Sequence, residues 1–222
     1  GQDLDEFRCI NKQTLINLVS KLDNSNKLPD KIIFSSTISV YGEKINQAKY
    51  PEDSLKNPSS PYAITKLEAE EYLLDSYRLQ SWILRFAPVY SSDFQLNINR
   101  RTKVGDIYYK VGDGSKKLSL CNLENIGLVV KSILEDQVPP GAYNISDSTD
   151  YTYNDLLKYV KAKWVIPIPI FLVRTFFFIG KMINNLFLIE NTIKLISDNI
   201  FPSNKINQYI KLPSVLLKHK KC

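Results

Sequence analysis

Histidine and cysteine are scarce in this chain of 222 residues. The single histidine, His219, lies close to the end of the chain. Its isolation argues against Ser-His hydrolysis and His-rich metal sites, so we expect no metal. Cys9, Cys121 and Cys222 are far apart and odd in number, which favours neither a disulfide framework nor a zinc site and fits a reducing cytoplasm.

Glycine-rich phosphate-binding patterns are also missing. Neither G-x-G-x-x-G nor G-x-x-G-x-x-G occurs, so the sequence lacks the turn that holds a dinucleotide pyrophosphate at a helix N-terminus. The acidic start, Gly1–Asp5, is unlike a signal peptide. The net charge of +6 is spread along the chain, and its only concentration, Lys218–Lys221, indicates a solvated terminus. We therefore expect no nucleic-acid partner.

Long apolar runs are absent as well. The most apolar stretch, Val165–Ile189, is interrupted by Pro167 and Pro169 and then by Arg174 and Lys181. Its unbroken run is far shorter than the about 20 residues that a transmembrane helix needs. We expect a core helix here, and the alternative is an interfacial helix that faces a membrane surface.

The sequence does contain a strand and a helix that bring hydroxyl groups and a lysine together. The apolar run Ile32–Phe34 predicts a buried strand. Thr37 would lie just past its carboxyl end, where open α/β sheets bind ligands. Ser60–Pro61 is typical of a helix start, with an N-cap and a first helical position. Tyr62 and Lys66, four residues apart on that helix, would share a face.

This arrangement suits the interconversion of an alcohol and a ketone. A phenol with a pKa near 10 is a poor acid-base catalyst at neutral pH, and an ammonium group one turn away would lower that pKa. Thr37 could hold the substrate oxygen while Tyr62 takes or gives its proton and hydride passes to a cofactor. The same spacing recurs at Tyr159 and Lys163, but no such strand precedes that pair, and we interpret it as structural.

Three motifs surround these residues: Ser35-Ser36-Thr37, Val40-Tyr41-Gly42 and Pro61-Tyr62 with Lys66. Together they resemble the motifs of the extended short-chain dehydrogenases, the NAD-dependent epimerase/dehydratase family that acts on nucleotide sugars. The resemblance implies that Thr37, Tyr62 and Lys66 form a catalytic triad, with Lys66 also contacting the nicotinamide ribose. It further implies an α/β fold: the C-terminal part of a Rossmann-type doubly wound parallel sheet with a small, mostly helical substrate-binding lobe.

The same resemblance assigns binding residues, with NAD (or NADP) as cofactor and a nucleotide sugar as substrate. The cofactor-binding candidates are Asn11, Ser35, Ser36, Tyr62, Lys66, Phe86 and Pro88, and the substrate-binding candidates are Thr37, Arg101 and Lys117. Two of these keep an alternative: Asn11 as a surface helix residue and Arg101 as part of a solvated loop. Pro88 stands where many epimerases carry an Asn, and because proline has no N–H, diphosphate contacts must differ there.

The resemblance also divides the chain. Residues 1–90 and 118–146 are expected to form a partial Rossmann-like NAD-binding domain, and residues 91–117 and 147–222 the substrate-binding lobe. Helices are expected over Leu4–Leu22, Tyr62–Arg78 and Asn154–Lys163, and strands over Trp82–Phe86, Leu118–Leu123 and Ala142–Ile145. We expect a fragment whose first strands are missing, which leaves Ile32–Phe34 as a sheet edge.

The function implied is a cytoplasmic, NAD-dependent nucleotide-sugar epimerase or 4-keto reductase for surface polysaccharide synthesis. Family dehydratases carry acidic residues directly after the catalytic threonine, where this chain has Ile38 and Ser39, so we expect no loss of water. The alternative is a non-catalytic or truncated family member that acts as a binding or scaffold protein. The resemblance also allows a homodimer.

Overall fold

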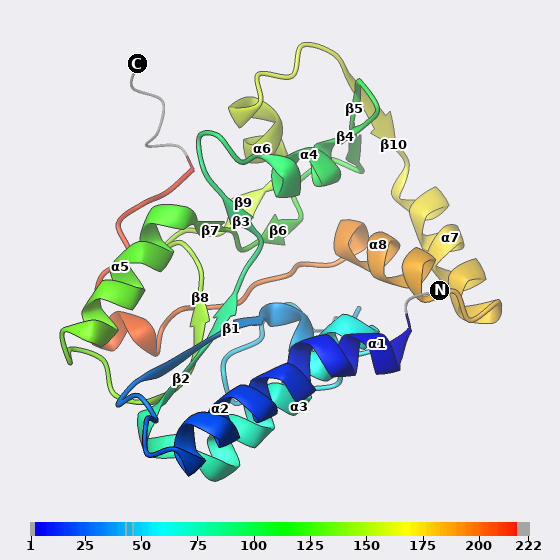
Figure 1. The fold of residues 1–222 in the computed structure, drawn as a ribbon. Helices are drawn as coiled ribbons and strands as arrows, with labels where there is room; N and C mark the ends of the chain where they lie inside the picture. Colours follow the sequence, from blue (N-terminus) through cyan, green and yellow to red (C-terminus); the bar gives the residue numbers. More distant parts are fainter. Residues whose placement is uncertain (1–2, 43, 46, 217–222) are drawn as a thin grey trace.

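A parallel sheet forms the centre of the molecule in the computed structural model, which describes residues 3–42, 44–45 and 47–216. Its strand order is β1-β2-β8 (Figure 1). These strands are β1 (Ile32–Thr37), β2 (Ser81–Phe86) and β8 (Gly141–Ile145). Within the described part of the chain β1 pairs with β2 alone, so the structure confirms that β1 is a sheet edge.

Helices from the first third of the chain cover one face of this sheet (Figure 1). They are α1 (Leu4–Arg8), α2 (Thr14–Asn24) and α3 (Pro61–Ser76). The helix expected over Leu4–Leu22 is present, but the π-helical segment Cys9–Gln13 interrupts it. Ile83 of β2 faces these helices, in contact with Val19 and Leu73.

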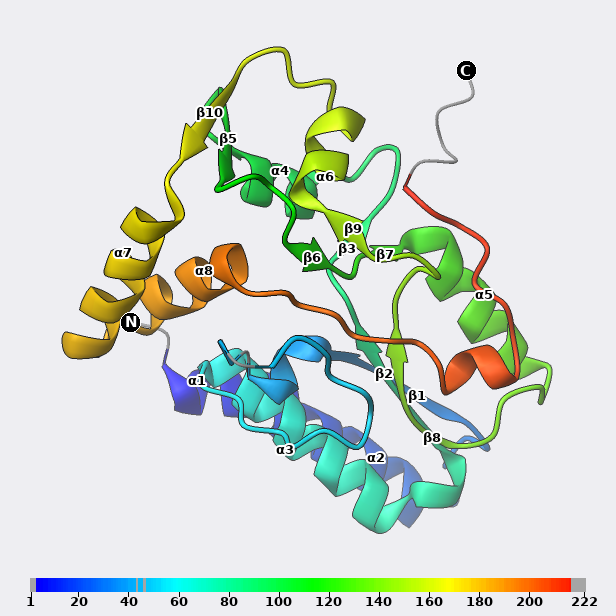
Figure 2. The same ribbon diagram turned by 180° about the vertical axis from the view of Figure 1, so that it is seen from behind.

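The opposite face of the sheet is covered by α5 (Leu123–Leu134) and by the returning C-terminal segment (Figure 2). Trp82 and Leu84 point to this face, because successive strand residues alternate in direction. Residues of the C-terminal segment complete this core: Phe201, Ile206, Ile210 and Leu212. The division of the chain into two domains stays a prediction, but this segment, expected in the substrate lobe, packs on the sheet.

A second lobe of short strands and helices lies beyond the carboxyl ends of the sheet strands. Its own apolar cluster is centred on Tyr90, Ile98, Leu120 and Leu156. The strands are β3 (Val89–Tyr90), β4 (Lys103–Val104), β5 (Ile107–Val111), β6 (Lys117–Leu118), β7 (Cys121–Asn122), β9 (Tyr151–Thr152) and β10 (Val165–Ile168). The helices are α4 (Leu96–Thr102), α6 (Tyr153–Tyr159), α7 (Ile170–Met182) and α8 (Leu186–Ile196).

Three local expectations are corrected. The strand expected over Leu118–Leu123 is two short strands, β6 and β7, which pair with different partners. The helix expected over Asn154–Lys163 ends at Tyr159. Val165–Ile189 is not one core helix but β10, α7 and the start of α8, because Pro167 and Pro169 favour extended backbone.

Most apolar side chains of α7 are exposed rather than buried in the core. Among the residues that the structure describes, no helix is both long enough and apolar enough to cross a bilayer. The solvated tail expected at Lys218–Lys221, together with His219 and Cys222, lies outside the described residues.

Candidate active site

The carboxyl end of β1 presents three hydroxyl residues with different surroundings. Ser35 is exposed, and its carbonyl accepts a hydrogen bond from Lys66 Nζ at 3.1 Å. Ser36 is buried and donates to the carboxylate of Glu70. Thr37 is the last residue of the strand rather than the residue past its end, and its Oγ1 contacts Ser39 Oγ at 3.2 Å. The threonine hydroxyl therefore lies at the sheet edge where ligands bind in open α/β folds.

Tyr62 and Lys66 lie in the first two turns of α3, which packs against β1. Ser60 takes the extended N-cap conformation, and Pro61 occupies the first turn, as the sequence predicted. Lys66 Nζ lies 4.8 Å from the Phe34 ring centroid and 5.9 Å from the Tyr62 ring centroid. The structure thus places both side chains on one face of α3 beside the end of β1, as their spacing predicts.

The ionisation of this pair differs from the simple expectation. Burial raises the pKa of the Tyr62 phenol above its ordinary value, and the ammonium of Lys66 does not offset this. Burial also lowers the pKa of Lys66, an effect that the negative charge of Glu70 opposes. Lys66 contacts the ring of Tyr62 and the carbonyl of Ser35. It therefore stays a prediction that Lys66 lowers the pKa of the Tyr62 phenol once cofactor and substrate are bound.

Asn11 contacts the same helix from the π-helical segment. Its Nδ2 donates to Thr65 Oγ1 at 3.1 Å, one residue before Lys66. Glu68 of α3 also binds Arg8 at 2.8 Å and Lys12 at 3.2 Å on the two sides of Asn11. Single π turns within α-helices occur frequently at functional sites. This irregularity, which periodicity alone does not reveal, directs the Asn11 side chain toward α3, the helix that carries Tyr62 and Lys66.

A buried ion pair fixes α3 to the sheet. Glu70 and Arg85 are 0% and 1% exposed, and Arg85 Nη2 lies 2.7 Å from Glu70 Oε2. Arg85 Nη1 also donates to the Tyr41 hydroxyl at 2.8 Å, and that hydroxyl donates to Asn144 Oδ1. Burial alone would lower the pKa of Arg85, but Glu70 raises it, so the guanidinium stays charged. The network connects Ser36 of β1 with β2 and β8.

Tyr41 and Gly42 of the Val-Tyr-Gly motif are structural in this arrangement. Tyr41 is fully buried, and Gly42 has a φ of +63°. A Cβ atom on Gly42 would lie 2.0 Å from the carbonyl oxygen of Asn57, so only glycine fits this turn. The two residues hold the loop that leads from β1 toward α3.

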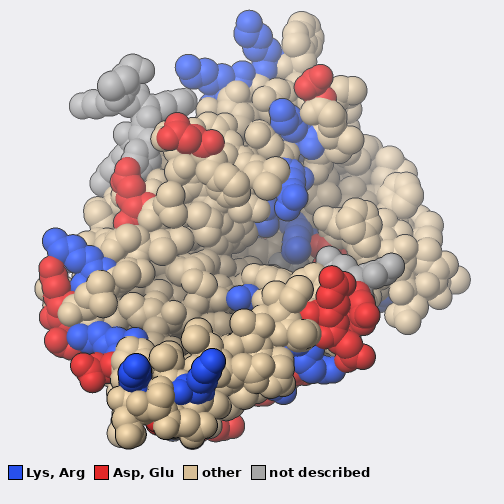
Figure 3. Space-filling view, viewed as in Figure 1, with Lys and Arg blue, Asp and Glu red and all other residues tan. Residues whose placement is uncertain are grey.

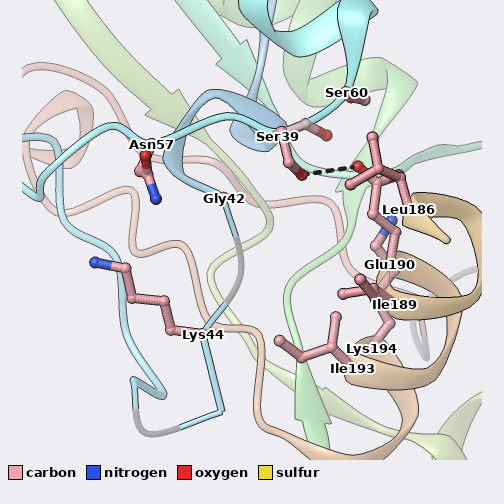
Figure 4. A pocket seen from close by; sticks show the side chains of 11 residues that line it. Ser39, Gly42, Lys44, Asn57, Ser60, Leu186, Ile189, Glu190, Ile193 and Lys194 are labelled. Carbon is pink, nitrogen blue, oxygen red and sulfur yellow. Dashed lines mark hydrogen bonds between the residues drawn. The ribbon is translucent and has the colours of Figure 1, made fainter. Parts of the chain in front are cut away.

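A cavity of about 250 Å³ opens between this loop and α8 (Figure 4). Ser39, Lys44, Asn57 and Ser60 line one side, and Ile189, Glu190, Ile193 and Lys194 line the other. Ser59 Oγ donates to Glu190 Oε1 at 3.2 Å across the gap. Thr37, Tyr62 and Lys66 do not line this cavity. It therefore adjoins the triad through Ser39 rather than containing it.

A second cavity, of about 230 Å³, lies between α4 and α8. Arg101 lines it, together with Tyr109, Tyr153 and Lys194. A narrow extension leads from Arg101 past Tyr153 to Pro88. The candidate Arg101 therefore faces a hollow within the second lobe, and the narrow extension of that hollow reaches Pro88.

The other binding candidates lie elsewhere. Phe86 packs against the sheet core, and the carbonyl of Pro88 accepts a hydrogen bond from Cys121 N. Lys117 has an exposed side chain on β6 and lines none of the three cavities described above. Lys194 borders all three cavities, but nothing in the sequence around it indicated a site.

Comparison with known proteins agrees with this arrangement. The NAD dependent epimerase/dehydratase family model matches residues 5–146, which is well over half of the chain. The chain belongs to this family of NAD-dependent enzymes. Its fold is that of the family's Rossmann-type members.

The match with this chain covers only part of each relative's length. The chain is 44% identical over 61 residues to an uncharacterized UDP-glucose epimerase, YtcB, of Bacillus subtilis (strain 168), which is 26% of this chain and 19% of that protein. The UDP-glucuronic acid 4-epimerase of Bacillus cereus, solved with NAD, superposes with a TM-score of 0.64 at 21% identity over 92% of this chain and 60% of that one.

A second similar structure was solved with a bound nucleotide sugar. It is the UDP-N-acetylglucosamine 4-epimerase of Methanobrevibacter ruminantium M1 in complex with UDP-N-acetylmuramic acid, with a TM-score of 0.55 at 25% identity. The match covers 71% of this chain and 55% of that one. The chain thus spans about a fifth of the curated relative and somewhat over half of these solved structures.

Proposed function

We propose that the protein containing this chain is a cytoplasmic NAD-dependent nucleotide-sugar 4-epimerase or 4-keto reductase that serves surface polysaccharide synthesis. The observation that carries the proposal is the placement of Tyr62 and Lys66 beside the end of β1 in a chain of this family. The sugar-nucleotide class is supported by the named epimerases that the chain resembles.

The hydroxyl groups of Thr37 and Tyr62 and the amine of Lys66 have different roles in the proton transfer. Tyr62 takes the proton from the sugar hydroxyl and returns it, which is the role of a general acid-base. Thr37 binds the same sugar oxygen, and its hydroxyl can reach it by giving up the contact with Ser39. Lys66 favours the phenolate form of Tyr62 once the site is assembled. NAD, when bound, would provide the acceptor and donor of the hydride at sugar C4.

The residues present fit one end of the cofactor. The ammonium of Lys66 is half-buried and already satisfies an oxygen, that of Ser35, at the open edge of β1. A ribose hydroxyl can replace that carbonyl as its partner, and Asn11 supports the same helix through Thr65. Ser36 and Phe86 contribute through packing and position. A glycine-rich pyrophosphate turn does not occur in these 222 residues, so they supply contacts only toward the nicotinamide ribose.

Substrate contacts are proposed at the hollow between α4 and α8 of the second lobe. Arg101 and Lys194 border it and would attract the diphosphate of a nucleotide sugar. Lys117 would contribute only from outside this hollow. Pro88 borders the narrow extension and offers no N–H to the diphosphate. A homodimer through the α2 and α3 surfaces also stays a proposal.

The reaction is proposed to proceed without loss of water. Ile38, which follows Thr37, is 6% exposed and packs in the core. Ser39, the next residue, contacts Thr37 and lines the neighbouring cavity. Neither is an acid or base suited to dehydration. Mass spectrometry should show a product that retains the mass of the substrate or gains two hydrogens, and a product lighter by one water would contradict this.

The experiment that tests the function replaces Tyr62 in the complete gene product. Tyr62→Phe removes the proton-transfer group and should lower turnover roughly 10²–10⁴-fold, with nucleotide-sugar binding by calorimetry little changed. Tyr159→Phe is the matched control, because it removes a hydroxyl from the second Tyr-x-x-x-Lys copy and should leave turnover intact. Loss of activity in Tyr159→Phe with full activity in Tyr62→Phe would reverse the assignment.

A scaffold role is the second candidate, because these 222 residues contain no glycine-rich pyrophosphate turn. A scaffold protein would bind its nucleotide sugar without turning it over. An active wild-type enzyme would exclude it. Nucleotide-sugar binding without turnover in the complete gene product, with either cofactor added, would favour it.

A further inference from the structure

The outer surface of α7 and the start of α8 is an apolar face with little cover. Phe171, Phe176 and Phe178 are 62%, 53% and 60% exposed, and Met182 is 86% exposed. We call this set the α7 face. It consists of Phe171, Leu172, Phe176, Phe178, Ile179, Met182, Ile183, Leu186 and Phe187. Figure 3 shows a largely uncharged surface over this part of the molecule, at the right of the view.

The inner side of α7 is firmly packed, so the exposure of its outer side does not result from a loosely placed helix. Val173 and Phe177 are buried against Ile193 and Ile196 of α8. A Cβ atom on Gly180 would lie 3.2 Å from the Leu188 side chain, so the two helices approach closely there. α7 is apolar on its outer side as well as on this inner side. Packing within the described chain therefore buries only the apolar side chains of the inner side.

The charged residues of the segment that contains the α7 face have one sign. Between Asp155 and Glu190 the sequence contains no acidic residue. The same 34 residues contain five cationic ones: Lys158, Lys161, Lys163, Arg174 and Lys181. Arg174 and Lys181, seven residues apart, lie together on one flank of α7. The natural partner of such a surface is apolar in its interior and anionic at its boundary.

An exposed tryptophan precedes β10, the strand that leads into α7. Trp164, directly before β10, is 88% exposed. It borders a shallow hollow with Lys161, Lys163 and Ile166, and Asp106 lines the same hollow. Tryptophan beside lysine is characteristic of the boundary between apolar and aqueous regions of a membrane, because its ring has an apolar body and a polar N–H.

We propose that the α7 face and Trp164 dock on an anionic lipid bilayer, with α7 lying in the plane of the interface. The 13 residues of α7 are about 20 Å long, which suits a helix that lies on a bilayer rather than one that crosses it. The apolar side chains enter the acyl boundary, while the flanking lysine and arginine side chains meet lipid phosphates.

Charge argues against a second copy of this chain as the occupant. Two α7 helices packed about a two-fold axis would bring Arg174 and Lys181 of both copies into one interface. The segment between Asp155 and Glu190 supplies no carboxylate to pair with them. Unpaired cations that lose their water make such an interface unfavourable.

Vesicle sedimentation of the complete gene product tests the proposal. Binding to vesicles of equal parts phosphatidylglycerol and phosphatidylcholine should exceed binding to phosphatidylcholine alone by about tenfold or more. Phe171→Asp with Phe178→Asp should abolish sedimentation. Leu55→Asp with Leu79→Asp is the matched control, because it adds the same charges at positions 72% and 89% exposed outside the α7 face, and it should retain binding.

Charge variants and a spectroscopic signal separate docking from aggregation. Arg174→Gln with Lys181→Gln should reduce binding to anionic vesicles several-fold and weaken its salt dependence. The fluorescence emission of Trp164 should shift to the blue when anionic vesicles are added. The Trp164→Phe variant identifies this signal, because it should lack the shift.

Three results would overturn the proposal. They are wild-type protein that ignores both kinds of vesicle, equal binding to both, and a dimer by light scattering that Phe171→Asp dissociates while vesicle binding is absent. The last result would assign the α7 face to a second copy.

Discussion

Two tyrosine–lysine pairs with the same four-residue spacing occupy different surroundings in this chain. Tyr62 and Lys66 both lie within α3, beside the end of β1. Tyr159 is the last residue of α6, and Lys163 lies beyond the end of that helix. A spacing of four places side chains on one face only when a helix includes both residues, so the second pair has the spacing without the geometry.

Packing separates the pairs further. The ring of Tyr159 meets that of Tyr90 at a centroid distance of 6.4 Å, in the apolar cluster of the second lobe, and Lys163 is exposed. Tyr62 instead meets Phe7 edge-on and keeps 38% of its surface exposed at the sheet edge. One tyrosine fills a core, and the other is available to a ligand.

The largest effect is expected from breaking the buried ion pair between Glu70 and Arg85, which fixes the helix that carries Tyr62 and Lys66. Glu70→Ala leaves the guanidinium of Arg85 buried without its carboxylate and removes the partner of Ser36. Removing one member of a buried ion pair costs about 3–5 kcal/mol, and we expect a loss of that size in the free energy of unfolding. Urea denaturation of the complete gene product measures it. A loss below about 1 kcal/mol would show that the ion pair does not hold α3 to the sheet.

The next prediction compares the two lysines. Lys66→Met should lower turnover by roughly 10–100-fold, because each unit by which the phenol pKa rises costs 1.36 kcal/mol of phenolate. Raising the pH should recover part of this loss, since a higher pH restores the phenolate of Tyr62. Lys163→Met is the control and should match the wild type at every pH. Equal losses in both variants would mean that lysine at this spacing acts through stability alone.

The sequence was sufficient for the elements that define the first pair. Apolar runs predicted β1, β2 and β8, and Ser60–Pro61 predicted the start of α3, because these signals are local. The π turn that holds Asn11 was not predictable, since its cause lies in contacts with α3. Glu70 was missed too, although a charged residue within the strand sequence Trp-Ile-Leu-Arg-Phe suggests a buried partner for Arg85.

The cavity residues could not be derived from the sequence at all. Lys194 reaches the hollow from α8, more than 90 positions after Arg101, and only the packing of α4 against the lobe brings them to one cavity. The α7 stretch was misjudged for a related reason. Its composition shows that it is apolar, but only the arrangement shows which side α8 covers.

A smaller effect on stability is expected from the N-caps of α3 and α6, the helices on which the two pairs begin. Thr152 caps α6 in a capping box with Asp155, whereas the Ser60 side chain makes no capping hydrogen bond to α3. Thr152→Ala should therefore cost about 1 kcal/mol of unfolding free energy, while Ser60→Ala should cost less than half of that. Thermal or urea denaturation of both variants compares them. The reverse order would mean that Ser60 acquires a capping bond in solution.

The smallest expected effect concerns the ion pair that joins α3 to the N-terminal helices. The side-chain hydrogen bond from Arg8, with help from Lys12, holds the pKa of Glu68 below its ordinary value of 4.5. A carboxylate whose pKa is lower in the folded than in the unfolded state adds stability above its unfolded pKa, and that stability is lost as the pH falls through the folded pKa. Glu68→Gln should thus cost about 0.2–1 kcal/mol at pH 7, the usual range for exposed pairs, and nothing at a pH well below the folded pKa.

The matched control for Glu68 is a pair that lies on a single helix. Lys131 and Glu135 are 3.7 Å apart and both largely exposed, so Glu135→Gln should change stability less than Glu68→Gln at pH 7. Glu68 connects separate helices, and its loss should also loosen the π-helical segment that presents Asn11. Faster amide hydrogen exchange at residues 9–13 in Glu68→Gln, but not in Glu135→Gln, would show that coupling. Unchanged exchange there would mean that Asn11 is positioned by its bond to Thr65 alone.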